Sequence, residues 1–421
     1  MLAPRSLISF TASSLNSRVS LSRSMPHLQF HKTPNSVSAE PAAAQGRYTR
    51  RPFCKDRQLY RNEGFLSHAY INRVKTAVPT NEVHRSFLRF AASQLAEAPR
   101  LQCVFRRMAD NGGIENRYSY IVPSEDPEGT TFDVDGIFRL GAFPGTAKRM
   151  EMFETYAPRL AKQAVDRLEL GEDRGRITHL IVTSCTGFSA PGIDLEIIAL
   201  CGLSGSVERT MIGFMGCYAA INGLKLARHI VRSEPLSRVL LVNVELCTLH
   251  LKETADLEKL LSFCLWGDGC AASLVTADAV GIRLASFKAV VAPDTRDLMR
   301  WSVRDDGFDM VLSGRVPAAI QETLSGGHRA LLGGASIGDI DLWAVHPGGR
   351  SVLDAVARAL NLPSGALHSS REVLRDNGNM SSATVMFVLE KMLATATPGR
   401  LGCGMAFGPG LTAETMMFQT V

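Results

Sequence analysis

The sequence lacks any uninterrupted apolar run of about 18 residues, the length that a helix needs to cross a bilayer. It also lacks a Cys-x-x-Cys pair, although it contains nine cysteines, so a zinc ribbon or a thioredoxin-like motif is not indicated. An odd number of scattered cysteines in a chain of 421 residues is typical of free thiols in a reducing compartment. We therefore expect a cytoplasmic protein without a membrane span.

Acidic residues are nearly absent from residues 1–50, where six lysines and arginines accompany a single acid, Glu40. This segment accounts for the whole net charge of +5, so the remainder is neutral and shows no excess of positive charge for nucleic acid. The Ser/Arg-rich composition of residues 1–55 is compatible with an organelle targeting segment. We favour a disordered leader, or an upstream extension with the true start at Met25. A secretory signal is not indicated, because no apolar core follows the first basic residue.

Short β-branched apolar runs alternate with helical patterns from about residue 60, which is typical of an α/β protein. The runs predict strands at 178–183, 238–244, 270–276 and 341–346. The helical patterns lie at 193–200, 217–231, 351–360 and 379–393. Each half, 56–280 and 281–421, contains a strand with a polar end, a helix, and then an apolar helix whose start carries a polar residue. We therefore expect two similar halves related by a pseudo-twofold axis.

Three polar side chains occupy equivalent places in these halves: Cys217, His346 and Asn379. Because ligands of open α/β sheets bind at the carboxyl ends of strands, we expect the three to converge. Cys217 begins an apolar helix after Gly213 and Gly216, which permit a close approach of the chain. The N–H groups of a helix start stabilise a thiolate, and a neighbouring imidazolium adds to this, so we expect a lowered pKa for the Cys217 thiol.

The neutral amide of Asn379 carries information about the reaction. Cysteine hydrolases also combine cysteine, histidine and asparagine, so the three residue types alone leave the reaction open. No carboxylate lies in the three segments, however, which suits a substrate that brings its own carboxylate, such as malonyl. Decarboxylation needs hydrogen-bond donors at the thioester oxygen as negative charge develops, and both His346 and Asn379 can donate.

Five motifs occur in one order along residues 60–421, and together they resemble the type III polyketide synthases, which are chalcone synthase-like enzymes. The motifs are Gly216-Cys217-Tyr218-Ala219-Ala220, Trp266-Gly267-Asp268-Gly269, His346-Pro347-Gly348-Gly349, Gly378-Asn379-Met380-Ser381-Ser382-Ala383 and Phe407-Gly408-Pro409-Gly410-Leu411-Thr412. The segment 183–192 is similar to the bacterial branch, since Cys185 stands where plant enzymes usually have threonine.

This resemblance implies a thiolase-like αβαβα fold of five layers, an obligate homodimer, and no metal or cofactor. It implies iterative decarboxylative condensation of malonyl-CoA onto an acyl-CoA starter, followed by cyclisation to a pyrone or a phenolic or resorcinol ring. Cys217 would carry the growing chain. His346 would activate the thiol and form the oxyanion hole together with Asn379.

The resemblance also implies a substrate-binding set. It comprises two aromatic gate residues, Trp266 and Phe308; two residues of the 183–192 segment, Cys185 and Thr186; and four others, Glu245, Thr248, Ser381 and Gly410. Glu245 and Ser381 fall where related enzymes hold polar groups that influence cyclisation. For Cys185, a second nucleophile is an alternative to a lining residue.

The sequence departs from the family at the CoA entrance, where three basic residues are usual. Only Arg107 matches, and Val104 and Asn111 take the other two places. Binding of the CoA phosphates is then weaker, or another residue such as Arg106 supplies the positive charge. Alternatively, the site binds another thioester carrier. Ala190 is small where many relatives have a larger residue, so we expect an enlarged cavity wall that is shared across the dimer. Ala190 and Cys185 together favour a medium-to-long acyl starter.

Two other functions stay open at this point. One is a ketoacyl-synthase-III-like enzyme that performs a single condensation. Such an enzyme uses the same three residue types, cysteine, histidine and asparagine, although its motifs around histidine and asparagine differ. A non-catalytic binding protein of the same fold is the third hypothesis, against which the intact set Cys217, His346 and Asn379 argues.

Overall fold

The computed structural model describes residues 67–421, so the predicted leader at 1–55 lies outside the described residues. The described residues lie in one compact unit. Nine strands join in one sheet in the order β11-β12-β13-β8-β1-β7-β6-β4-β5. Their bounds are β1 Tyr70–Ala77, β4 His179–Ser184, β5 Glu208–Gly213, β6 Val239–Leu246, β7 Asp268–Thr276, β8 Ile282–Val291, β11 Leu342–Val345, β12 Leu401–Gly408 and β13 Thr412–Thr420.

Four strands of each half follow the same order with the same directions, and β5 adds a fifth strand to the N-terminal half. In the N-terminal half, β4 is parallel to β6, and β7 is antiparallel to β6 and β1. In the C-terminal half, β11 is parallel to β12, and β13 is antiparallel to β12 and β8. The two sets meet where Tyr70 pairs with Arg283 and Ile71 with Ile282. The fold therefore has the two similar halves that the sequence pattern predicts.

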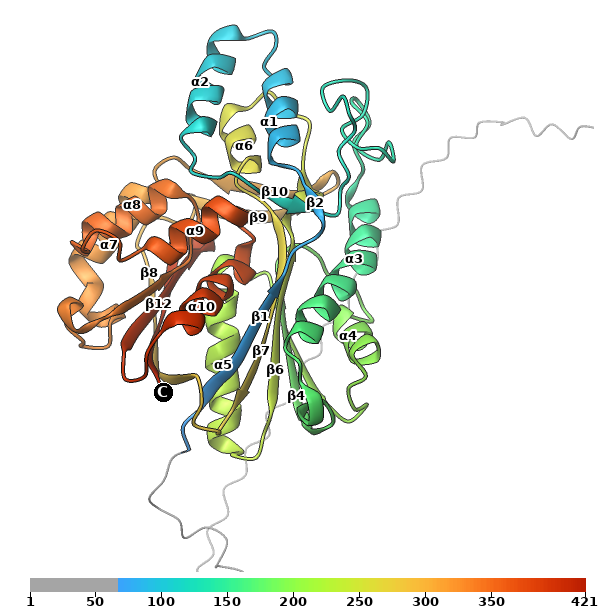
Figure 1. Cartoon of the computed structure of the whole chain (residues 1–421). Coiled ribbons are helices and arrows are strands. Elements are labelled where there is room, and N and C mark those ends of the chain that lie inside the picture. The colour runs from blue at the N-terminus through green and yellow to red at the C-terminus, as the bar shows by residue number, and fades with distance from the viewer. Residues whose placement is uncertain (1–66) are drawn as a thin grey trace, which may run out of the picture. The chain divides into compact units, whose positions relative to one another are not determined.

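Helices form three layers around the two halves of the sheet (Figure 1). The N-terminal half is covered on its outside by α3 (Thr146–Arg167) and α4 (Ile193–Cys201), and the C-terminal half by α7 (Val316–Leu331), α8 (Arg350–Ala359) and α9 (His368–Asn377). Between the halves lie α5 (Ala219–Ser233) and α10 (Thr384–Thr395). This arrangement gives the expected αβαβα order of layers.

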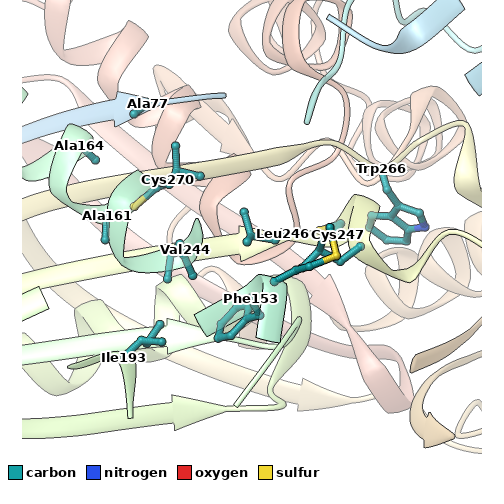
Figure 2. Close-up of a cluster of buried hydrophobic side chains, with 14 of the residues drawn as sticks. Ala77, Phe153, Ala161, Ala164, Ile193, Val244, Leu246, Cys247, Trp266 and Cys270 are labelled. Carbon is teal, nitrogen blue, oxygen red and sulfur yellow. The ribbon is translucent and has the colours of Figure 1, made fainter. Parts of the chain in front are cut away.

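Alternating side chains of the strands fill the space between layers. Leu180 and Val182 of β4 join the cluster under α3, whereas Ile181 joins the cluster around α5. Figure 2 shows Phe153 of α3 close to Val244 of β6 in the first of these clusters. Because such side chains are closely packed, truncating one to alanine typically costs about 3–5 kcal/mol of stability for a phenylalanine.

A cap lies at the end of the sheet where β4 and β6 stop (Figure 1). Its helices are α1 (His84–Ser93), α2 (Pro99–Asp110) and α6 (Leu257–Phe263), and the small pairs β2 (Asn81–Glu82) with β3 (Tyr118–Ser119) and β9 (Met299–Arg304) with β10 (Gly307–Leu312) complete it. The hairpin of β9 and β10 contacts α6 and the turn that follows β6. The cap thus covers the carboxyl ends of strands, where the catalytic residues are expected.

The predicted strands and helices are present, with boundaries shifted by a few residues. The two central helices begin later than predicted, at Ala219 and Thr384, because a short 3-10 turn precedes each one: Gly216–Tyr218 before α5 and Ser381–Ala383 before α10. None of the helices from residue 67 onward is both long and apolar enough to cross a membrane. The cysteines in this part of the chain are free thiols.

Candidate active site

A small cavity lies between the cap and the strand ends, with a volume of about 40 Å³. Cys217, His346 and Asn379 all line it, and they are only 6 %, 1 % and 1 % exposed. Cys217 comes from the N-terminal half, and the other two residues come from the C-terminal half. The structure therefore brings together the three side chains that the sequence places in equivalent positions.

Cys217 lies in the 3-10 turn directly before α5. Gly216 has φ +72°, and a Cβ atom at this position would lie 2.4 Å from Cδ of Pro409, so only glycine fits here. Gly213 behaves differently, because a Cβ there would meet nothing within 4 Å. Of the two glycines singled out in the sequence, only Gly216 lies too close to a neighbour to be replaced by a larger residue. Its close packing on Pro409 places Cys217 next to the turn after β12.

His346 directly follows β11, where its backbone N–H donates to the carbonyl of Met405 at 2.7 Å. Both ring nitrogens are buried and have no hydrogen-bond partner. Buried polar atoms in native proteins are nearly always paired, so a free imidazole in a cavity indicates a site for a ligand. A Cβ on Gly348 would lie 3.7 Å from Nε2 of His346, in ordinary contact, so the glycine leaves the ring open on that side.

Asn379 has a fixed amide orientation. Its Oδ1 accepts a hydrogen bond from the backbone N–H of Ser381 at 2.9 Å, which identifies this atom as the oxygen. Its Nδ2 donates only a long bond of 3.3 Å to the carbonyl of Gly348. The amide N–H₂ group is therefore the end that remains available to a ligand.

The charge states in this cavity differ from the sequence-based expectation. Burial raises the pKa of the Cys217 thiol to about 12, although Ser381 opposes the shift by hydrogen bonding. Burial also lowers the pKa of His346 to about 3. The expectation of a lowered thiol pKa was wrong, because removal from water outweighs the effect of the helix start. At neutral pH the two groups form a neutral thiol and a neutral imidazole.

Cys185 and Ser381 also line the cavity, as the resemblance implied, and the Ser381 hydroxyl lies 3.1 Å from Sγ of Cys185. Burial raises the pKa of the Cys185 thiol well above its ordinary value, and the carboxylate of Glu245 adds to this shift. The Cys185 thiol is therefore protonated at neutral pH, as the Cys217 thiol is, and it lies at the lining position that the resemblance implied.

Glu245 and Thr186 lie behind the cavity wall instead of in it. Glu245 is fully buried and accepts hydrogen bonds from the Cys185 backbone N–H at 2.9 Å, from Thr186 Oγ1 at 2.9 Å and from Ser382 Oγ at 2.6 Å. Burial raises its pKa. The carboxylate thus fixes the loop that carries Cys185 from behind the cavity wall, whereas the resemblance placed Glu245 among the substrate-binding residues.

Thr248 and Gly410 are likewise outside the cavity lining. Thr248 is buried and donates to a carboxylate oxygen of Asp268 at 2.8 Å. Gly410 has φ +72° in the turn between β12 and β13, which presents the neighbouring Pro409 to the cavity. Both residues support the site from outside.

The hairpin of β9 and β10 forms a wall of the cavity that the sequence-based site does not contain. Trp301 pairs directly with Met310, and Met299 with Leu312, and all four residues line the cavity. The predicted gate residue Trp266 also lines it. The other predicted gate, Phe308, is not among the lining residues.

Phe308 lies two residues nearer the hairpin turn than Met310, so its side chain is on the same face of β10 but farther along. Its ring stacks on His250 with centroids 4.2 Å apart. Met310 therefore occupies the wall position that we had assigned to Phe308. The Asp306-Gly307 turn between alternating apolar residues is a sequence signal for such a hairpin.

Arg107 lies in a larger groove of about 730 Å³ beside the catalytic cavity. The two hollows share the lining residues Leu312, Gly348 and Val352. Arg350, at the start of α8, also lines this groove, whereas Arg106 lines a different surface hollow. The second basic group at the predicted entrance is therefore Arg350 and not Arg106.

Ala190, which we expected in a cavity wall shared across the dimer, is exposed in the single chain and does not line that chain's cavity, so its role stays a prediction. Within the chain, the bulky hairpin residues named above line the cavity.

The five layers, with a buried cysteine at the start of a central helix and a histidine and an asparagine from the second half, define a thiolase-like acyl-transferring enzyme. The chain belongs to the chalcone and stilbene synthase family, because the N-terminal domain of that family matches residues 60–279 and the C-terminal domain matches residues 283–421. It is a type III polyketide synthase, an acyltransferase. This finding decides against the single-condensation alternative.

Two curated relatives are similar over most of the chain. "Alpha-pyrone synthesis polyketide synthase-like Pks18" of Mycobacterium tuberculosis strain H37Rv is 33 % identical over 368 residues, which are 84 % of this chain and 91 % of the relative. "Bisdemethoxycurcumin synthase" of Oryza sativa subsp. japonica is 33 % identical over 344 residues, covering 75 % of this chain and 82 % of the relative.

Solved structures agree with the fold. PKS-I from the brown alga Ectocarpus siliculosus has a TM-score of 0.75 at 27 % identity and covers 85 % of this chain and 100 % of that one. The C-terminal type III polyketide synthase domain of Steely1 from Dictyostelium has a TM-score of 0.77 at 23 % identity, with coverage of 84 % and 99 %.

Proposed function

We propose that this polyketide synthase builds its product on Cys217, with His346 as general base and with His346 and Asn379 as the oxyanion hole. The observation that supports this most strongly is the convergence of these three side chains, from both halves, around one buried cavity. The substrates are malonyl-CoA and an acyl-CoA starter, and the product is a pyrone or a phenolic or resorcinol ring. The pyrone is the product class named for the mycobacterial relative.

Loading begins from the neutral pair. Because burial keeps His346 unprotonated, a ring nitrogen can accept the Cys217 proton as the sulfur attacks the thioester carbon of the starter. The C–S bond to CoA breaks, and the departing thiolate takes the proton back from the imidazolium. Free CoA leaves, and the acyl group remains on Cys217.

Extension uses the donors of the same cavity. The bond between the malonyl methylene carbon and its carboxylate breaks, CO₂ leaves, and the electron pair forms an enolate whose oxygen accepts hydrogen bonds from His346 and Asn379. The methylene carbon then attacks the Cys217 thioester, a C–C bond forms and the C–S bond breaks. The Cys217 thiolate that is released can attack the elongated CoA thioester in the next round.

The groove beside the cavity suits the CoA part of both substrates. Arg107 and Arg350 line it, and guanidinium groups bind phosphates through paired N–H donors. The walls also contain apolar side chains such as Met108 and Leu261, which can contact a pantetheine arm. We propose that the thioester enters through this groove, past Gly348, to reach Cys217.

We also propose that the enzyme is a cytoplasmic homodimer that pairs through β5. This strand is at the edge of the sheet, and Met211 and Phe214 are 40 % and 36 % exposed there, with Leu195 and Leu200 of the adjacent α4 exposed as well. An open edge with exposed apolar side chains is a surface that a second chain can cover. Leu200→Arg combined with Met211→Arg should give a monomer in sedimentation velocity. A dimer that persists in this variant would contradict the proposal.

The catalytic assignment is tested with Cys217→Ala. This variant should form no product that contains the starter, because no thiol remains to hold the acyl group. It should still release CO₂ from malonyl-CoA, since His346 and Asn379 are intact. Mass analysis with labelled malonyl-CoA and a panel of medium and long acyl-CoA starters reports the number of extensions in the wild type, expected to be two or more. Starter-derived product from Cys217→Ala would refute the role of the thiol.

A further inference from the structure

Three nitrogen atoms of cavity-lining side chains are buried without any hydrogen-bond partner. Two belong to His346, whose role has been proposed above, and the third is Nε1 of Trp266. An unpaired buried N–H is costly, and native proteins retain such groups mostly where a ligand or a water completes them. Trp301, the other tryptophan in the cavity, is different, because its Nε1 donates to the carbonyl of Cys185 at 2.6 Å.

Trp266 lies next to Asn379 at the cavity. The backbones of these two residues form an isolated parallel β-bridge. The Asn379 N–H donates to the carbonyl of Leu265 at 2.8 Å, and the Gly267 N–H donates to the carbonyl of Asn379 at 3.0 Å. The side chains of Trp266 and Asn379 both line the cavity, so the indole and the amide are neighbouring donors.

Arg117 holds this segment in place from outside the cavity. Its guanidinium is fully buried, and Nη1 donates to the carbonyls of Phe263 and Trp266, both at 2.7 Å. Its side-chain stem also limits the space at Gly378, where a Cβ would lie 2.7 Å from Cγ of Arg117. The backbone of Trp266 is therefore fixed on both sides, and the indole is positioned before any ligand binds.

The indole nitrogen is turned away from the apolar core. In Figure 2, it lies on the side of the ring that is remote from Cys247, while the carbon edge of the ring faces the cluster. The carbon edge of the ring thus packs against the apolar core, and the N–H remains available to a polar group.

We propose that the indole N–H of Trp266 donates a hydrogen bond to a carbonyl oxygen of the acyl or polyketide chain in the catalytic cavity. This inference rests on the proposed condensing function. An indole is a donor only, so its partner must be an acceptor, and a poly-β-ketone provides a carbonyl oxygen at every second carbon. Since the indole does not titrate in the working range, its contribution is independent of pH.

The first test compares Trp266→Phe, which removes the N–H but keeps an aromatic ring, with the wild type. The value of kcat/KM for malonyl-CoA should fall about 3- to 10-fold, the range for one neutral hydrogen bond, and by the same factor at every pH between 6.5 and 8.5. Trp343→Phe is the matched control for the loss of a buried indole, because Trp343 does not line the cavity, and kcat/KM for malonyl-CoA should stay close to the wild-type value. A kcat/KM for malonyl-CoA in Trp266→Phe equal to that of the wild type would overturn the inference. The proposed function is tested separately, by identifying the product that the wild-type enzyme forms.

The second test observes the hydrogen bond itself and separates it from any effect of ring size. The ¹⁵N-labelled indole signals of the Cys217→Ala variant are recorded with acetoacetyl-CoA, which carries two carbonyl groups, and with free CoA, which lacks them. The Trp266 N–H proton, assigned through Trp266→Phe, should move downfield with acetoacetyl-CoA only. An unchanged signal under saturating acetoacetyl-CoA, or an equal shift with free CoA, would overturn the proposal.

Discussion

The reactivity of Cys217 depends on its surroundings more than on its place at a helix start. The N–H groups of a helix start favour a thiolate, but the cavity is closed, and loss of hydration keeps the sulfur protonated. The neighbouring imidazole of His346 is neutral for the same reason, so the two groups do not form an ion pair in the resting enzyme. In the proposed mechanism, the thiolate forms at neutral pH when its proton is transferred to His346 with substrate present.

This charge state makes a prediction for chemical labelling. Alkylation of Cys217 by iodoacetamide in the free enzyme should be slow at pH 7 and should accelerate up to the highest pH at which the fold persists, because the reactive thiolate fraction rises with pH. Peptide mass spectrometry over a pH series measures the rate at this residue, and the exposed Cys103 provides an internal control. A rate that is already maximal at pH 7 would show that the pair rests as thiolate and imidazolium.

At the scale of elements, the hairpin of β9 and β10 decides how much chain the cavity can hold. Trp301 and Met310 face each other across the hairpin, and the bulky indole of Trp301 is fixed by its bond to the Cys185 carbonyl. Trp301→Ala should therefore enlarge the cavity and raise kcat/KM for long acyl-CoA starters relative to short ones. The comparison is made by competition between two starters in one reaction, with thermal unfolding as the measure of lost packing. An unchanged preference would mean that the chain grows elsewhere.

The elements themselves were largely accessible from sequence, because periodicity and turn residues are local signals. The strands before Cys185 and His346 and the apolar helix after Asn379 were identified in this way. Local signals do not report which side chains meet across long sequence distances. The gate was therefore assigned to Phe308 instead of Met310, and the pKa of Cys217 was misjudged, because both depend on packing among the hairpin, the 3-10 turn and β11.

At the scale of the whole molecule, buried ionisable groups make stability depend on pH. Burial lowers the pKa of His84, His250 and His346 to about 3 from an ordinary 6.5, so the unfolded chain binds more protons than the folded one in the interval between. Stability is therefore lost as the pH falls below about 6.5. Asp268 opposes this trend, because burial raises its pKa to about 6, and Glu245 shifts in the same direction.

The three histidines outnumber the two carboxyls, and the pKa shift of each histidine is larger than that of Asp268. The free energy of unfolding should decrease from pH 7 to pH 5 by on the order of 4 kcal/mol. Urea denaturation at the two pH values measures this difference, and His250→Asn should reduce it by removing one of the three imidazoles. Equal or greater stability at pH 5 would mean that these histidines are hydrated in the folded state.

The order of strands has a consequence for biosynthesis. His346 follows β11, whose one partner in the sheet is β12, and β12 in turn depends on β13 for its other side. A nascent polypeptide that has emerged only as far as Pro398 already contains the three proposed catalytic residues, yet it lacks β12 and β13, the two strands that follow β11 in the sheet. Activity should thus be acquired only after β12 and β13 have been synthesised and have joined the sheet beside β11.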